Sequence, residues 1–93
     1  MRVRYSMRAR AHLVAMKEYW LSRSAPHADR MGSAIRATTV SLEYFPSIGH
    51  AGRSPGTFEI VVRGIPYVIV YEFNVSTTDE IMILGVFHMA QDR

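Results

Sequence analysis

Three residues in the C-terminal half of the chain are of types that could carry out chemistry together. His88 ends the last apolar run, Arg63 ends an earlier one, and Arg53 lies in the loop before that earlier run. Imidazole titrates near neutral pH and transfers protons, and guanidinium presents a planar fork that pairs with phosphate. A histidine with arginine neighbours could therefore move a proton next to a phosphate, if the fold brings these segment ends together.

The other residues that could bear chemistry form no recognisable site. The chain has no cysteine, and its four histidines are far apart in the sequence: His12, His27, His50 and His88. It has neither a glycine-rich phosphate loop nor the paired spacing of metal ligands. We therefore expect no metal and no cofactor. For each histidine, a structural position at or near the surface is the alternative to a functional one.

Composition limits the class of protein. A chain of 93 residues with 48% hydrophobic content predicts a single folded domain over residues 1–93. No apolar run approaches the ~18 residues of a membrane span, and no signal-peptide pattern follows the N-terminal arginines. We therefore expect a cytoplasmic protein. The net charge is +3 and ten of the eleven basic residues are arginine, which permits an anionic partner but does not require one.

Three runs rich in Val, Ile, Tyr and Phe must position the candidate residues. They cover residues 56–63, 67–73 and 80–88, and they are separated by Gly64-Ile65-Pro66 and by the polar stretch 74–79. Runs of this kind predict consecutive antiparallel strands. The middle run lacks polar alternation, so we expect a central strand covered on both faces. The first run alternates and places Glu59 on the face opposite Phe58 and Ile60.

The N-terminal half predicts a short strand and two helices. Residues 1–5 fit an edge strand whose arginines disfavour pairing with other chains. Apolar residues then recur at helical spacing in residues 7–23 and again in residues 26–44, with Ser6 as a capping residue and Pro26 in a first turn. The two stripes are Ala9, Leu13, Met16 and Trp20, then Ala28, Met31, Ile35, Thr39 and Leu42. The segment 45–56 is the one long irregular stretch.

The predicted order is an N-terminal edge strand, a helical hairpin and a three-stranded antiparallel meander (β-α-α-β-β-β). This is an α+β fold in which the hairpin packs on one face of the sheet.

The sequences of the three C-terminal runs resemble those of a known toxin family. Gly56-Thr57-Phe58-Glu59-Ile60-Val61-Val62, Ile65-Pro66-Tyr67-Val68-Ile69-Val70-Tyr71 and Ile83-Leu84-Gly85-Val86-Phe87-His88 are similar to the C-terminal half of ParE-type toxins of the ParE/RelE superfamily. The upstream chain fits as well. The resemblance implies a RelE/ParE-like fold and the toxin component of a type II toxin–antitoxin system.

The ParE branch implies a toxin without catalytic residues. Its members inhibit DNA gyrase by direct protein contact and are neutralised by a cognate ParD-like antitoxin, with no direct DNA binding by the toxin. Physically, an arginine-rich surface can pair with an acidic antitoxin segment, the hairpin offers a groove for an amphipathic helix, and an edge strand can accept a further strand. His50 and Phe58 stand where many members carry arginine, and if those arginines contact the target, activity is weakened or redirected.

Two alternatives remain open. The RelE branch implies a ribosome-dependent messenger-RNA endonuclease, in which His88, Arg63 and Arg53 would be the catalytic residues. Against it, Pro66-Tyr67 stands at the start of the central strand, where that branch often carries a basic His-Arg pair. The other alternative is a relative that has lost toxicity and persists as an antitoxin-binding protein. Growth arrest on induction would exclude it.

Overall fold

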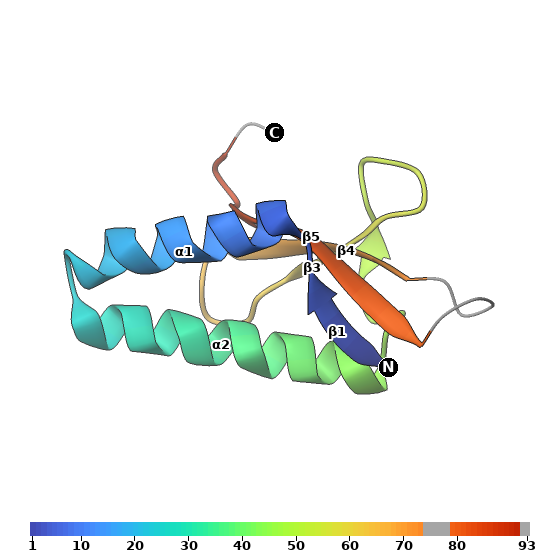
Figure 1. Cartoon of the computed structure of the whole chain (residues 1–93), viewed down its shortest axis with the longest axis horizontal. Helices are drawn as coiled ribbons and strands as arrows, with labels where there is room; N and C mark the ends of the chain where they lie inside the picture. Colours follow the sequence, from blue (N-terminus) through green and yellow to red (C-terminus); the bar gives the residue numbers. More distant parts are fainter. Residues whose placement is uncertain (74–78, 92–93) are drawn as a thin grey trace.

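The computed structural model describes residues 1–73 and 79–91, which form two helices and a five-stranded sheet (Figure 1). The elements are β1 (Arg2–Tyr5), α1 (Met7–Leu21), α2 (Ala25–Tyr44), β2 (His50–Ala51), β3 (Phe58–Val61), β4 (Tyr67–Phe73) and β5 (Glu80–His88). The strand order is β1-β5-β4-β3-β2. The α+β prediction is confirmed, whereas the predicted turn at 74–79 lies outside the described residues except for Asp79. Among those residues, no helix is long and apolar enough to cross a membrane.

Both helices begin at serine caps. The Ser6 hydroxyl accepts a hydrogen bond from Ala9 N (3.0 Å), and the Ser24 hydroxyl accepts one from His27 N (3.3 Å). These bonds satisfy backbone donors that a first helical turn leaves unpaired. The predicted stripes face the core: the buried residues are Ala9, Met31, Ile35, Thr39 and Leu42, and Leu13, Met16 and Trp20 pack against them.

The outer edge of β5 has two different neighbours. β1 pairs with its first half in parallel, from Arg2 opposite Glu80 to Tyr5 opposite Ile83. Beyond the end of β1, the cap and first turns of α1 pair with β5. Ser6 N donates to Ile83 O (2.9 Å), and Val86 N donates to His12 Nδ1 (3.2 Å). The sequence predicted β1 as an edge strand but gave no indication of its parallel pairing with β5.

β4 lies at the centre of the sheet, as its apolar pattern predicts. Ile69 and Tyr71 are fully buried on the side that carries the helices, and Val68, which points to the opposite face, is also buried. The ladder with β5 contains a bulge. Val70 pairs with Gly85 and Tyr71 pairs with Ile83, so Leu84 is an extra residue.

The segment between α2 and β3 is more ordered than its sequence indicates. It contains β2, whose His50 and Ala51 pair with Glu59 and Phe58 of β3. The expectation of a wholly irregular segment was therefore wrong. The same segment covers Glu59, which is only 7% exposed although it lies on the polar face of its strand.

The hydroxyl of Tyr71 holds this segment against the sheet. It donates a hydrogen bond to Pro46 O (2.8 Å) and accepts one from Gly49 N (3.0 Å). A Cβ added at Gly49 would lie 2.6 Å from that hydroxyl and 2.7 Å from Glu59 O, so the close approach requires glycine. Burial raises the pKa of Tyr71 above its usual value of 10.0, against the lowering effect of the Gly49 hydrogen bond.

We predict that Tyr71→Phe destabilises the protein by about 1–3 kcal/mol, because the variant leaves the partners of the buried hydroxyl unpaired. Chemical denaturation measures the change. The matched control is Tyr44→Phe, which removes a hydroxyl from a side chain that is 73% exposed. Equal denaturation midpoints for Tyr71→Phe and the unmodified chain would show that the hydroxyl does not anchor the segment.

Candidate functional site

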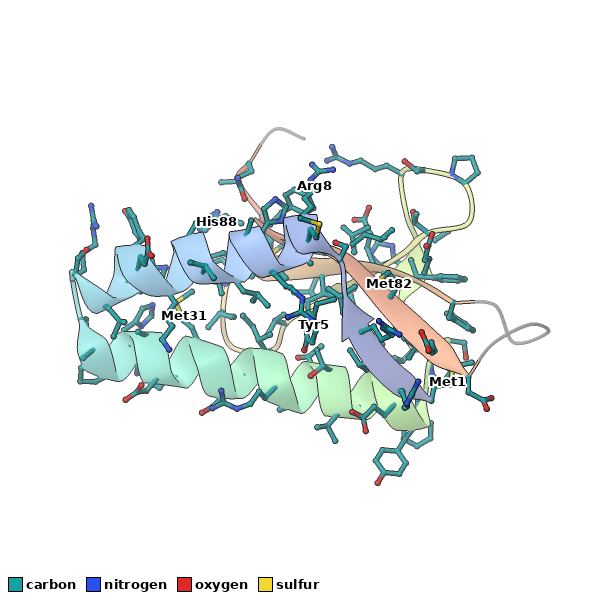
Figure 2. All side chains as sticks on the ribbon, viewed as in Figure 1. Met1, Tyr5, Arg8, Met31, Met82 and His88 are labelled. Carbon is teal, nitrogen blue, oxygen red and sulfur yellow. The ribbon has the colours of Figure 1, made fainter. Side chains whose placement is uncertain are left out.

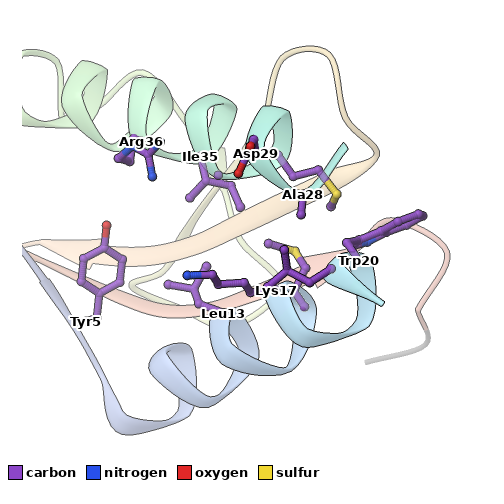
Figure 3. A pocket seen from close by; sticks show the side chains of 12 residues that line it. Tyr5, Leu13, Lys17, Trp20, Ala28, Asp29, Ile35 and Arg36 are labelled. Atoms are coloured by element: carbon purple, nitrogen blue, oxygen red, sulfur yellow. The ribbon is translucent and has the colours of Figure 1, made fainter. Parts of the chain in front are cut away.

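A groove runs between the two helices, with Tyr5 of β1 at one end (Figure 3). It has a volume of about 270 Å³, and a mostly apolar floor is flanked by charged side chains. We call it the hairpin groove. Its lining residues are Tyr5, Leu13, Met16, Lys17, Trp20, Leu21, Ala28, Asp29, Met31, Gly32, Ile35 and Arg36. Lys17 of α1 lies on one wall of the groove, and Asp29 and Arg36 of α2 lie on the other (Figure 3). Because two of these three charges are positive and the floor is apolar, the groove suits an amphipathic segment with acidic residues beside its apolar face.

Small residues leave room in this groove. A Cβ added at Gly32 would have only Arg36 Nη1 nearby, at 3.5 Å, which is ordinary contact. Gly32 is therefore not needed for the helices to approach each other, and its missing side chain opens the groove wall instead. Trp20 lines the same groove and donates a hydrogen bond from Nε1 to the hydroxyl of Tyr67 (3.2 Å). This bond ties the helical hairpin to the start of β4.

The three residues singled out in the sequence are only partly brought together. His88 and Arg53 line one cavity of about 170 Å³, which we call the His88 cavity. Arg63 lies in the exposed turn after β3 and is not among the residues lining that cavity. Among the described residues, the lining is His50, Arg53, Glu59, Val61, Val68, His88 and Met89. The catalytic role of the three residues stays a prediction.

His88 is held in place by the segment that follows it. Its Nδ1 accepts a hydrogen bond from Ala90 N (3.0 Å), and its own N–H donates to Gln91 Oε1 (2.6 Å). The ring packs edge-on against Tyr67, with centroids 5.1 Å apart. Since Nδ1 acts as an acceptor, a neutral His88 carries its proton on Nε2.

Glu59 also lines the His88 cavity, although the sequence did not indicate it as a candidate site residue. Its carboxylate accepts a hydrogen bond from Arg53 N (3.2 Å). A carboxylate in an alternating strand ordinarily points to solvent, and only the folding of the preceding segment over β3 buries it. Among residues 1–73 and 79–91, no cluster of three or more His, Asp or Glu side chains is placed to hold a metal ion.

His12 connects α1 to β5 in an apolar setting. Besides accepting from Val86 N, its ring packs edge-on against Phe87, with centroids 4.8 Å apart. Burial, and then the nearby positive charge of Arg8, lower the pKa of His12 below its usual value of 6.5. Neutral His12 therefore belongs to the folded state, because a protonated Nδ1 could not accept the Val86 hydrogen bond.

We predict that protonation of His12 lowers the stability of the protein as the pH falls below 6.5. In that range the unfolded state binds the proton more readily than the folded state, so the free energy of unfolding falls as pH decreases. His12→Asn offers an amide oxygen near the position of Nδ1 but does not titrate. Urea denaturation between about pH 5 and 7 is expected to show a smaller loss of stability on acidification for this variant than for the unmodified chain. Parallel pH profiles would contradict the assignment.

Comparison with known proteins gives a consistent picture. The family described as "ParE toxin of type II toxin-antitoxin system, parDE" matches residues 3–93. A curated relative is Y4kP of Sinorhizobium fredii (strain NBRC 101917 / NGR234), which is named as a candidate toxin. It is 30% identical over 90 residues, covering 97% of this chain and 90% of the relative.

Solved structures share the fold. The chromosomal ParDE toxin–antitoxin system from P. aeruginosa matches with a TM-score of 0.79 and 19% identity, over 95% of each chain. The intact E. coli RelBE toxin–antitoxin complex matches with a TM-score of 0.61 and 15% identity, over 98% of each chain. The isolated E. coli RelE toxin gives 0.62 and 14%, over 98% of this chain and 86% of that one. At these identities the likeness establishes the fold.

Proposed function

Because this chain belongs to the ParE toxin family of type II toxin–antitoxin systems, we propose that it is a cytoplasmic, single-domain toxin that inhibits DNA gyrase by direct contact. In this proposal a cognate antitoxin neutralises it. The observation that carries the proposal is the family match over residues 3–93, which includes both helices, β2 to β5 and all of β1 except Arg2. The match to a ParDE system at a TM-score of 0.79 supports the antitoxin partner.

The start of β4 favours inhibition by contact over RNA cleavage. Pro66 and Tyr67 stand at this point, and Tyr67 is 9% exposed and bonded to Trp20. Pro66 accepts a hydrogen bond from Met89 N (2.8 Å) through its carbonyl. These residues are thus engaged within the protein. Neither could supply the cationic contacts that cleavage next to a phosphate requires.

We predict that the purified chain prevents DNA gyrase from supercoiling a relaxed plasmid and that linear DNA accumulates. Agarose gels of the ATP-dependent reaction measure both effects. The matched control is the same chain incubated beforehand with the antitoxin encoded beside its gene, which is expected to restore supercoiling. Unchanged supercoiling with protein shown to be folded by circular dichroism would rule out gyrase inhibition.

The second candidate, ribosome-dependent cleavage of messenger RNA, rests on one observation: His88 and Arg53 line the same cavity. In that case His88→Ala and Arg53→Ala would abolish growth arrest. Arg63→Ala would have a smaller effect, because Arg63 lies outside the cavity. Full toxicity in all three variants would exclude the ribonuclease.

The hairpin groove is the site where we propose that an amphipathic antitoxin helix binds. The apolar floor matches the apolar face of such a helix, and Lys17 and Arg36 match acidic residues along its margin. Groove contacts of this kind bury apolar side chains, so the space at Gly32 is expected to decide affinity.

We predict that Gly32→Phe weakens antitoxin binding at least about tenfold, because the ring fills the groove. The matched control, Gly32→Ala, adds only a Cβ in ordinary contact. It is expected to bind as the unmodified chain does and to raise stability by about 1 kcal/mol through helix propensity. Isothermal titration calorimetry measures affinity, and denaturation measures stability. Equal antitoxin affinity for Gly32→Phe and Gly32→Ala would show that the antitoxin binds outside the hairpin groove.

A further inference from the structure

A second cavity lies next to the His88 cavity, between the start of α1 and the loop before β3. It has a volume of about 260 Å³, and we call it the Arg8 cavity. Its lining residues are Arg8, Arg53, Ser54, Thr57, Glu59, Val70, Leu84 and Phe87. Two arginines that are 45 positions apart in the sequence (53 minus 8) thus face one space. The volume is below the ~300 Å³ at which cofactor and drug-sized pockets begin, so it suits one or two side chains.

Arg8 is positioned by the first turn of α1 (Figure 2). Its guanidinium lies over the ring of Phe87, 5.4 Å from the centroid. The turn itself is fixed by Ser6, whose hydroxyl caps the helix and also donates to Leu84 O (3.2 Å). Two contacts with β5 therefore hold Arg8 at the cavity: the hydrogen bond from Ser6 to Leu84, and the packing of the Arg8 guanidinium on Phe87.

Arg53 is positioned by a tight loop. Its backbone N–H donates to the buried carboxylate of Glu59, and Gly52 N donates to Thr57 O (2.8 Å). Within the loop, Ser54 O accepts hydrogen bonds from Thr57 N (3.2 Å) and from the Thr57 hydroxyl (2.7 Å). A loop closed by so many bonds loses little entropy when a ligand binds.

We propose that the Arg8 cavity binds a single carboxylate from a partner protein, an Asp or Glu side chain flanked by aliphatic residues. The two guanidiniums supply up to ten N–H donors between them, so each can bind an incoming oxyanion in addition to contacts that it already makes. Glu59 offsets one of the two positive charges, which leaves one net positive charge for one carboxylate. Val70, Leu84 and Phe87 provide the apolar floor for the flanking aliphatic groups.

The same residues disfavour nucleic acid as the ligand. Within residues 1–73 and 79–91, Phe87 is the one aromatic residue that lines the cavity, and its ring already has Arg8 over it and the His12 ring against it. A base therefore has no open ring on which to stack, although stacking is a main source of affinity for single strands. The one net positive charge also matches a single carboxylate and leaves the successive charges of a phosphate chain uncompensated.

The cavity is distinct from the hairpin groove, so this inference goes beyond the proposed function and does not depend on gyrase or on a particular antitoxin. It can be tested with defined probes. The first is the peptide acetyl-Leu-Glu-Leu-amide, and its matched control is acetyl-Leu-Gln-Leu-amide, which differs only in lacking the carboxylate. A thymidine oligonucleotide and inorganic phosphate test the competing anions.

We expect the Glu peptide to shift the amide resonances of Leu84, Phe87 and Thr57 in ¹⁵N NMR spectra. The Gln peptide should bind at least about tenfold more weakly, since it lacks the charge-assisted bonds. Arg8→Gln and Arg53→Gln should weaken the Glu peptide to a similar degree. Arg63→Gln, which removes an equal charge from an exposed turn, should not change its affinity.

Three results would overturn the proposal: equal responses to the two peptides, no loss of affinity in Arg8→Gln and Arg53→Gln, or tighter binding of the oligonucleotide or phosphate than of the Glu peptide. Arg8→Lys and Arg53→Lys test whether misfolding, rather than loss of the guanidinium, explains a loss of affinity in the glutamine variants. They keep the charge but lose the planar fork, so they are expected to retain the fold and to bind with intermediate affinity.

Discussion

The backbone groups on the outer edge of β5 impose the constraint on which the rest of the structure depends. An unpaired edge strand exposes donors and acceptors that other chains can pair with, and burying them unpaired is costly. Here β1 satisfies the first half of the edge, and the cap residue Ser6 and His12 of α1 satisfy positions beyond it. This shared edge joins the N-terminal strand and helix to the C-terminal sheet. It also brings Arg8 next to β5.

A second set of hydrogen bonds fixes the segment that leads to β2, at the other edge of the sheet from β1. The Tyr71 hydroxyl, bonded to Pro46 and Gly49, brings the chain from the end of α2 around the sheet edge. The chain then pairs as β2 and closes the loop that carries Arg53 over Glu59. The two cavities exist because this segment is fixed. A buried carboxylate can persist there because it has hydrogen-bond partners.

The molecule consequently presents two different surfaces for recognition. The hairpin groove is apolar with charged margins, whereas the Arg8 and His88 cavities share Arg53 and Glu59 and are polar at the rim. An apolar groove derives affinity mainly from buried area, and paired charges contribute more to specificity and association rate. A partner segment that reached both surfaces would combine affinity with discrimination.

The sequence alone determined both helices and four of the five strands in the described residues, all except β2. The 3.6-residue stripes, the Ser6 cap, Pro26 in a first turn and the three β-rich runs predicted both helices, the meander and the central position of β4, because these signals are local. Only the tertiary structure decided the parallel pairing of β1 with β5, the short strand β2 and the burial of Glu59. Those features join residues far apart in the chain, such as Tyr71 to Pro46 and His12 to Val86, and no local periodicity encodes them. For the same reason, residue types pointed to His88 and Arg53, whereas the fold placed Arg8 beside Arg53 and left Arg63 outside their shared face.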